Sequence, residues 1–237
     1  MRVRRGGLFQ LALVAVARVA GAALGIVSAV TTLARGAKPL HPVGTVARAV
    51  LTVTPASAAV GAPLLDEPGE HACLVRASYA VGTGPEHTDI EGFALRVLAA
   101  RADAGPSDLL FASTGVGRWN RQLLALRRPG RHAPQTTLLP IRAAGHPLLF
   151  RLDPVDGATQ PWPAQYVLSW ARGRGPWQRF ASLAVSWEGR DDAPDRFDPV
   201  ANPLSGTTQY AAVARLREPA YRLARLVRPS AGRLPRT

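Results

Sequence analysis

Short apolar runs separated by turns that contain proline and glycine follow one another between residues 46 and 187. Seven such runs can be read from the sequence, at 46–53, 72–77, 93–99, 108–112, 147–152, 165–170 and 180–187. Several alternate between apolar and polar residues or are rich in Val, Leu and Trp, which is typical of β-strands joined by turns. Short strands at this spacing predict a mainly β fold of the α+β class, built as a barrel or a sandwich.

Two later segments have a different pattern and are predicted as helices, at 117–126 and 212–227. Between the last strand and the second of these helices, residues 187–203 are rich in turn-forming residues. This stretch carries four aspartates, Asp191, Asp192, Asp195 and Asp198. We interpret it as a long surface loop with a solvated acidic cluster that leads into the last helix.

The N-terminal segment 8–34 is apolar apart from one charge, Arg18, and basic residues precede and follow it. Its length suits a transmembrane helix, which needs about 20 apolar residues, although a central arginine costs about 2.5–3.5 kcal/mol on insertion scales. A signal peptide and a helix lying on the domain or on a membrane surface are the alternatives. We therefore expect a helical segment at 1–36 and one domain at 37–237, either cytoplasmic or membrane-associated through residues 8–34, with secretion as the third option.

The formal net charge of +13 is concentrated at the two ends of the chain. Residues 1–50 hold seven basic side chains and no acidic one, and residues 215–237 hold seven basic side chains and one acidic one, so the middle is neutral. No helix-turn-helix, zinc-finger or RNP pattern accompanies this charge, which argues against nucleic acid as the partner. Basic ends suit an anionic membrane surface or an anionic ligand held by several arginines.

Common catalytic signatures are absent from the sequence. There is no GxSxG, HExxH, CxxC, P-loop or GxGxxG pattern, and the five histidines have no metal-ligand spacing. The single cysteine, Cys73, excludes an internal disulfide. Because Ala72 and Leu74 flank it, we interpret Cys73 as a small buried side chain, with a reactive thiol as the alternative.

A series of short segments, taken in order, resembles the catalase family. Lys38-Pro-Leu-His41-Pro-Val-Gly44 resembles the catalase segment that carries the distal histidine, and Leu74-Val-Arg76-Ala-Ser78 resembles the strand that follows it. Asp89-Ile-Glu-Gly92-Phe-Ala-Leu-Arg96 is similar to the family's D-x-R-G-F-A-L-K/R strand, and Asp108-Leu-Leu falls at the distance of its next strand. Arg217-Glu-Pro-Ala-Tyr221 fits the family's R-x-x-x-Y motif. The resemblance implies a small, truncated relative of catalases with an antiparallel β-barrel, an N-terminal apolar helix and a C-terminal helix.

The same resemblance implies a haem b cofactor, with Tyr221 as the proximal iron ligand. The cofactor-binding residues that it implies are Lys38, Arg76, Arg217, Tyr221 and Arg228. Positive charge beside Tyr221 would suit this role, because a tyrosine has a pKa of about 10 and a tyrosinate needs such charge. On a helix Arg217, Arg225 and Arg228 would share one face with the tyrosine. The alternative is a solvated basic face with the Tyr221 ring packed on the barrel, and Pro219 places Arg217 before regular helix.

The catalytic residues that the resemblance implies are His41 and Ser78. A neutral imidazole can move a proton between peroxide oxygens near pH 7, and the Ser78 hydroxyl would fix its tautomer. A turn histidine satisfied by the backbone is the alternative for His41.

Two departures from the catalase pattern bear on function. Catalases place an asparagine in the distal pocket where this chain has Phe111-Ala112-Ser113-Thr114, and Glu91 stands in place of the strand's arginine. The missing asparagine puts efficient dismutation of hydrogen peroxide in doubt. The function expected from the resemblance is peroxidase- or isomerase-like chemistry on hydrogen peroxide or on an organic, for example lipid, hydroperoxide. A haem-less binding module at membranes and a phosphodiesterase-type hydrolase are the alternatives.

Overall fold

The computed structural model describes residues 44–54, 59–80, 87–98, 105–128, 132–155, 162–191 and 197–211. The chain divides into two units, one of them His41–Gln209 and the other Met1–Leu40 together with Tyr210–Thr237. The description below is of the first unit. The predicted helices at 8–34 and 212–227 lie outside the described residues, so these helices and the boundary at residue 36 stay predictions.

The described residues form ten strands and one short helix. In chain order these are β1 (Gly44–Val53), α2 (Pro63–Asp66), β2 (Gly69–Tyr79), β3 (Glu91–Val97), β4 (Ser107–Ser113), β5 (Gln135–Thr136), β6 (Ile141–Ala143), β7 (His146–Pro154), β8 (Gln165–Arg172), β9 (Gln178–Asp191) and β10 (Thr207–Gln209). Within these ranges, no helical segment has the length and apolar character that crossing a membrane requires.

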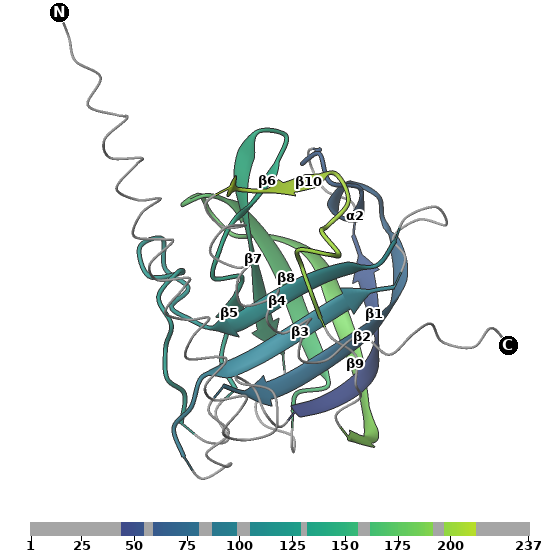
Figure 1. The fold of residues 1–237 in the computed structure, drawn as a ribbon, viewed down its shortest axis with the longest axis vertical. Coiled ribbons are helices and arrows are strands. Elements are labelled where there is room, and N and C mark those ends of the chain that lie inside the picture. Colours follow the sequence, from purple (N-terminus) through teal and green to yellow (C-terminus); the bar gives the residue numbers. More distant parts are fainter. Residues whose placement is uncertain are drawn as a thin grey trace, which may run out of the picture. The chain divides into compact units, whose positions relative to one another are not determined.

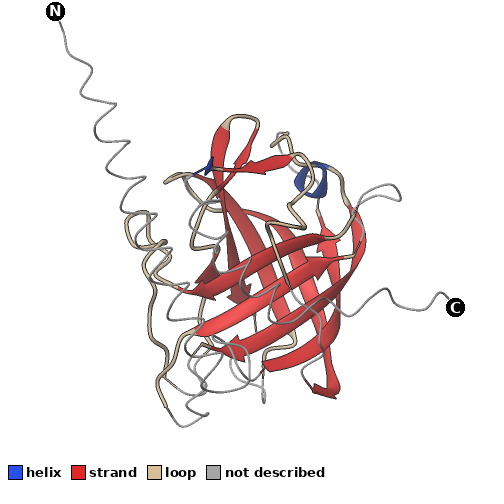
Figure 2. Cartoon of the chain, in the orientation of Figure 1, coloured by secondary structure: helices blue, strands red, loops and turns tan. Residues whose placement is uncertain are grey.

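All strand pairings are antiparallel, and they close a barrel (Figures 1 and 2). The sheet runs β10-β6-β7-β5-β4-β3-β2-β1-β9-β8, and an additional β7–β8 pairing joins its two sides. The closed ring therefore consists of the eight strands β7, β5, β4, β3, β2, β1, β9 and β8, while β6 and β10 extend it beside β7. The ring closes between β4 and β7 through the two residues of β5, each of which pairs with both neighbouring strands.

The core lies inside the ring, because alternate residues of each strand point inward. On β2 and β3 the inward series are Cys73, Val75 and Ala77, and Phe93, Leu95 and Val97, all of them buried. They are joined by large apolar side chains from the other strands, among them Leu51, Leu152, Leu168, Phe150 and Phe180. Burying each side chain of this size contributes about 1.5–3 kcal/mol of transfer free energy. The prediction of a mainly β barrel is confirmed, as is that of Cys73 as a small buried side chain.

The seven predicted strands correspond to β1, β2, β3, β4, β7, β8 and β9. The strands β5, β6 and β10 were not predicted, because two or three residues are too few to show an alternation.

The predicted helix at 117–126 is wrong. Arg121 N–H donates to the Gly117 carbonyl over 3.1 Å, but the chain then turns back, and Leu124 forms an antiparallel bridge with Thr114. Gly117 N–H donates to the side chain of Asn120 over 2.8 Å. Asparagine side chains compete for backbone groups in this way and so favour turns over helix.

The interpretation of residues 187–203 as a solvated loop is wrong in part. Strand β9 continues to Asp191, and Asp198 is buried. The Asp198 carboxylate accepts hydrogen bonds from Val200 N–H at 2.9 Å and Ala201 N–H at 3.1 Å. These bonds offset the cost of burying the aspartate, whereas Asp192 and Asp195 lie outside the described residues.

Candidate functional site

Strand β2 carries Arg76 and Ser78 on the face opposite to the core. Val75 and Ala77 point into the barrel, so the residues between and after them point outward. Despite this, Arg76 is only 8% exposed and Ser78 only 3%. Arg76 and Ser78 are the two predicted site residues that the structure describes. They therefore share one outer face of β2 that is shielded from solvent.

The strand register places a row of small residues across this outer face. Gly44 of β1 pairs with Ser78, Ser78 pairs with Gly92 of β3, and Gly92 pairs with Ala112 of β4. No member of this row is larger than serine, so no bulky side chain projects from it across the four strands. Arg76 belongs to the next row, where it pairs with Ala94.

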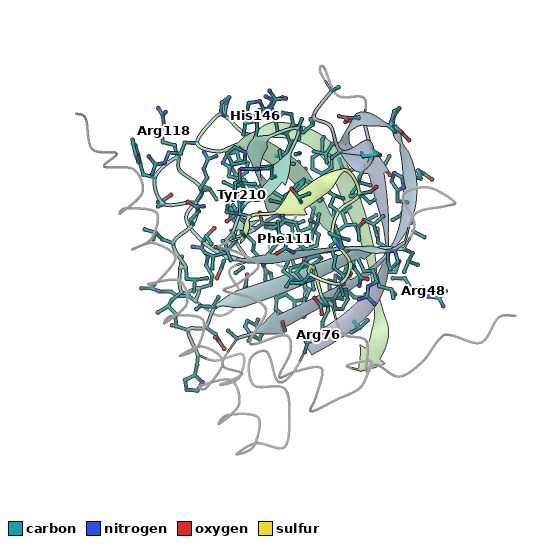
Figure 3. The ribbon with its side chains drawn as sticks, turned by 45° about the horizontal axis from the view of Figure 1, so that its top comes forward. Arg48, Arg76, Phe111, Arg118, His146 and Tyr210 are labelled. Atoms are coloured by element: carbon teal, nitrogen blue, oxygen red, sulfur yellow. The ribbon has the colours of Figure 1, made fainter. Side chains whose placement is uncertain are left out.

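Gly44 lies so close to Arg76 that a side chain has no room there. A Cβ on Gly44 would lie 2.7 Å from both Cζ and Nη2 of Arg76, and 2.8 Å from the Ala77 carbonyl oxygen. Glycine at this position therefore lets the Arg76 guanidinium lie over the start of β1 (Figure 3). Gly44 closes the first of the catalase-like segments, and its contact with Arg76 gives a physical reason for the glycine.

Five of the predicted site residues lie outside the described residues. These are Lys38, His41, Arg217, Tyr221 and Arg228. Their roles stay predictions, as do the cofactor and catalytic roles of Arg76 and Ser78, whose positions alone are described.

A polar cluster that the sequence analysis missed lies on the inner face of the same end of the barrel. Glu91 is buried and points inward from β3, and its Oε1 lies 3.0 Å from Nδ1 of His132. Gln135 Nε2 lies 3.5 Å from the other carboxylate oxygen, and Gln135 Oε1 has no hydrogen-bond partner among the described residues. A buried carboxylate requires a hydrogen-bonding partner. A glutamate at the start of the apolar stretch E-G-F-A-L is therefore a sign in the sequence that such a partner exists. The sequence does not identify His132, 41 residues away, as the partner.

Aromatic rings surround this inner cluster. The ring of Trp162 lies 5.1 Å from that of His132 and 5.0 Å from that of Tyr79, and Phe93 lies 5.0 Å from Tyr166. Burial raises the pKa of both Tyr79 and Tyr166, and the negative charge of Glu91 raises it further. Burial and the charge of Glu91 therefore both disfavour the phenolate form of these two tyrosines.

Arg96 and Asp108, both quoted in the catalase-like segments, form a buried ion pair on the outer face. They are cross-strand partners on β3 and β4, joined by two hydrogen bonds of 2.7 and 2.8 Å. Asp108 also accepts from Asp198 N–H at 2.7 Å and from Asn202 Nδ2 at 2.9 Å. This pair therefore holds residues 198–202 against the barrel, which is a structural role for two of the quoted residues.

A metal centre built from side chains is not seen in the ranges that the structure describes. Within them, no group of three or more His, Cys, Asp or Glu residues is placed to hold an ion. The candidate site is the row of small residues on the outer face, together with Arg76 and Ser78. The Glu91–His132 pair lies on the inner face of the same end of the barrel.

The barrel has the fold of catalases. Three solved structures similar to it are a fungal catalase (TM-score 0.63, 12% identity), catalase A from Saccharomyces cerevisiae (0.61, 13%) and a bacterial catalase (0.60, 14%). The matches cover 82%, 86% and 81% of this chain, and 59%, 64% and 57% of those chains. The chain thus spans less than two thirds of the length of these catalases. No family model and no curated protein matches it in sequence, so the likeness establishes the fold.

Proposed function

We propose that this protein binds haem and acts on a hydroperoxide, as a small relative of catalases. The observation that supports the proposal most directly is the outer face of β1–β4, where the row Gly44, Ser78, Gly92 and Ala112 lies beside the buried Arg76. The likeness to catalases concerns the fold, and the cofactor and the reaction are the proposal.

Two features of the described part of the face support the proposal of a haem group. A porphyrin is flat and carries carboxylates, so it needs a wall without bulky side chains and at least one cation. The small-residue row provides the wall, and Arg76 provides a guanidinium, which suits a carboxylate in a bidentate geometry. Bound haem would supply a redox-active iron whose chemistry depends on its axial ligand and on the polarity of its pocket.

Tyr221 is the residue we propose as the iron ligand. The chain has four tyrosines, and in two of them, Tyr79 and Tyr166, burial and the charge of Glu91 raise the pKa and so disfavour a phenolate. Tyr221 instead stands in an arginine-rich stretch, and Arg217 and Arg228 would stabilise its phenolate. Together with Lys38 and Arg76, these arginines are also the groups we propose for the haem carboxylates.

His41 and Ser78 are the residues we propose for proton handling. Only two residues separate His41 from Gly44, so their Cα atoms can be at most about 11 Å apart. Gly44 pairs directly with Ser78, so the proposal requires His41 to reach the Ser78 hydroxyl from within this distance. His41 would hold or move a proton at a ring nitrogen, and Ser78 would orient the ring.

Ala112 bears on the choice of substrate. It closes the row at β4, within the stretch where catalases carry their distal asparagine, and its methyl group cannot donate a hydrogen bond. A pocket with fewer donors favours an organic hydroperoxide, whose alkyl chain adds apolar contact, over hydrogen peroxide. The proposed substrate class is accordingly an organic, for example lipid, hydroperoxide.

The experiment is an absorption spectrum of the full chain, purified and titrated with hemin. We expect a Soret band that Tyr221→Phe abolishes and that the matched control Tyr210→Phe leaves in place. Arg76→Ala should weaken hemin binding at least tenfold, whereas Arg48→Ala, an exposed arginine of the neighbouring strand β1, should not change it. A protein that stays colourless, or a Soret band that Tyr221→Phe does not alter, would contradict the proposal.

A further inference from the structure

Large exposed apolar side chains gather in one loop of the barrel. Seven such side chains are exposed in the described part of the chain, and four of them lie within residues 119–126. They are Trp119 (71% exposed), Leu123 (63%), Leu124 (51%) and Leu126 (66%). Single exposed apolar residues are common, but a cluster of this kind marks an interaction surface. We call residues 119–126, which carry these four side chains, the apolar loop.

The apolar loop is anchored to the neighbouring β8–β9 turn. Arg121 is buried, and its guanidinium donates to the carbonyl of Gly173 at 3.0 Å and twice to that of Gly175 at 3.1 Å. It also lies 4.3 Å from the ring centre of Trp177, whose Nε1–H donates to the Val116 carbonyl over 2.9 Å. These contacts hold the backbone of the loop in place, and the four apolar side chains extend from it into solvent.

The backbone of the loop is internally hydrogen-bonded. Gly115 N–H donates to the Leu123 carbonyl at 3.2 Å, and Ala125 N–H donates to the Ser113 carbonyl at 2.8 Å. Thr136 Oγ1 donates to the Arg121 carbonyl at 2.6 Å. A loop that enters the interface of a bilayer needs such pairing, because unsatisfied backbone groups are costly away from water.

Exposed basic side chains flank the apolar loop. Arg118 and Arg174 lie 5.7 and 4.4 Å from the ring of Trp119, and Arg118 lies at the margin of the barrel in Figure 3. Arg128 and Arg172 are exposed as well. Neither 109–128 nor 162–187 contains an aspartate or glutamate. The surface therefore combines exposed apolar groups with several exposed arginines.

We infer that the apolar loop docks the barrel onto an anionic phospholipid surface. Tryptophan favours the interfacial zone, because its ring is apolar and its N–H is polar. The leucines would enter the acyl boundary while Arg118 and Arg174 pair with phosphate and carboxylate headgroups. We infer lipid as the partner because the arginines complement the negative charge of an anionic phospholipid surface. The inference does not depend on haem binding or on the N-terminal segment.

The test uses fluorescence quenching by brominated lipids in phosphatidylcholine vesicles with and without phosphatidylserine. The five tryptophans are residues 119, 162, 170, 177 and 187, so the segment 8–34 contributes none to the signal. Trp119 is the most exposed of the five, since Trp162 and Trp170 are buried and Trp177 and Trp187 are partly buried. We expect the full chain to be quenched on phosphatidylserine vesicles, Trp119→Phe to lose this quenching, and added salt to weaken it.

Vesicle co-sedimentation of variants tests the leucines and arginines. Leu123→Ser with Leu126→Ser, and separately Arg118→Gln with Arg174→Gln, should each weaken binding at least tenfold. The control Val155→Ser removes an exposed apolar side chain at the far end of β7 and should leave binding unchanged. Because the substituted side chains are exposed, melting curves should show that all variants fold.

Three results would overturn the inference. The first is an absence of quenching by brominated lipid, and the second is quenching that persists in Trp119→Phe. The third is a dimer in light scattering that Leu123→Ser with Leu126→Ser converts to a monomer, because the apolar loop would then bind a second copy of the chain.

Discussion

Both carboxylate oxygens of Asp108 accept hydrogen bonds, four in total. Replacing Asp108 with asparagine should therefore destabilise the barrel strongly, because one of the two oxygens becomes an NH₂ donor. Oδ1 accepts from Arg96 Nε, while Oδ2 accepts from Arg96 Nη2, Asp198 N–H and Asn202 Nδ2. In Asp108→Asn the new NH₂ group would face one of these donors in either orientation. It would also remove the carboxylate that pairs with the Arg96 guanidinium, whose side chain is only 15% exposed.

Breaking a buried ion pair from one side costs about 3–5 kcal/mol. We take the lower value, about 3 kcal/mol, because Arg96 keeps some access to water and a cation–π contact with Phe197 at 5.0 Å. For a domain of this size each kcal/mol lowers the melting temperature by about 2–4 °C. Asp108→Asn should therefore lower it by about 6–12 °C.

Thermal unfolding followed by circular dichroism measures this effect, and Asp153→Asn is the matched control. Asp153 pairs with Arg151 at 2.6 Å, but their side chains are 23% and 24% exposed. Pairs with this access to water contribute about 1 kcal/mol or less, so the control should shift the melting temperature by less than about 4 °C. Equal shifts for the two variants would refute the reasoning that burial gives the Asp108 network its strength.

Three further predictions concern the core, the start of β1 and the inner cluster. Burial raises the pKa of the Cys73 thiol to about 12, so a thiol reagent at pH 8 should label the protein only in denaturant. Because the unfolded chain ionises this thiol first, stability should also fall by about 1.4 kcal/mol per pH unit between about pH 9 and 12. Gly44→Ala, whose Cβ would overlap Arg76 and the Ala77 carbonyl, should cost about 1–3 kcal/mol in urea unfolding, and no cost would refute the overlap. Glu91→Ala should cost about 1–3 kcal/mol because it leaves the buried Nδ1 of His132 without its hydrogen-bond partner; a melting curve equal to that of Glu70→Ala, an exposed acid on β2, would contradict this.

The pattern of apolar residues was sufficient to predict the strands that build most of the barrel. Strands β1, β2, β3, β4, β7, β8 and β9 each have inward side chains that must be apolar, and this requirement is visible in a single strand. The same argument predicts that Arg76 and Ser78 share a face, since they are two residues apart on β2. It could not predict the turns at 117–126, where the leucines face solvent instead of a core.

Strand pairing decided what the sequence by itself could not. Gly44, Ser78, Gly92 and Ala112 form a row only because β1, β2, β3 and β4 pair in one register, and a shift of one residue would turn each side chain to the other face. Arg96 meets Asp108, and Glu91 meets His132, through contacts between separate segments. The sequence by itself therefore determines which side chains each strand turns outward. Their assembly into a row of small side chains beside Arg76 depends on the tertiary structure, because the packing of the whole barrel sets the register between strands.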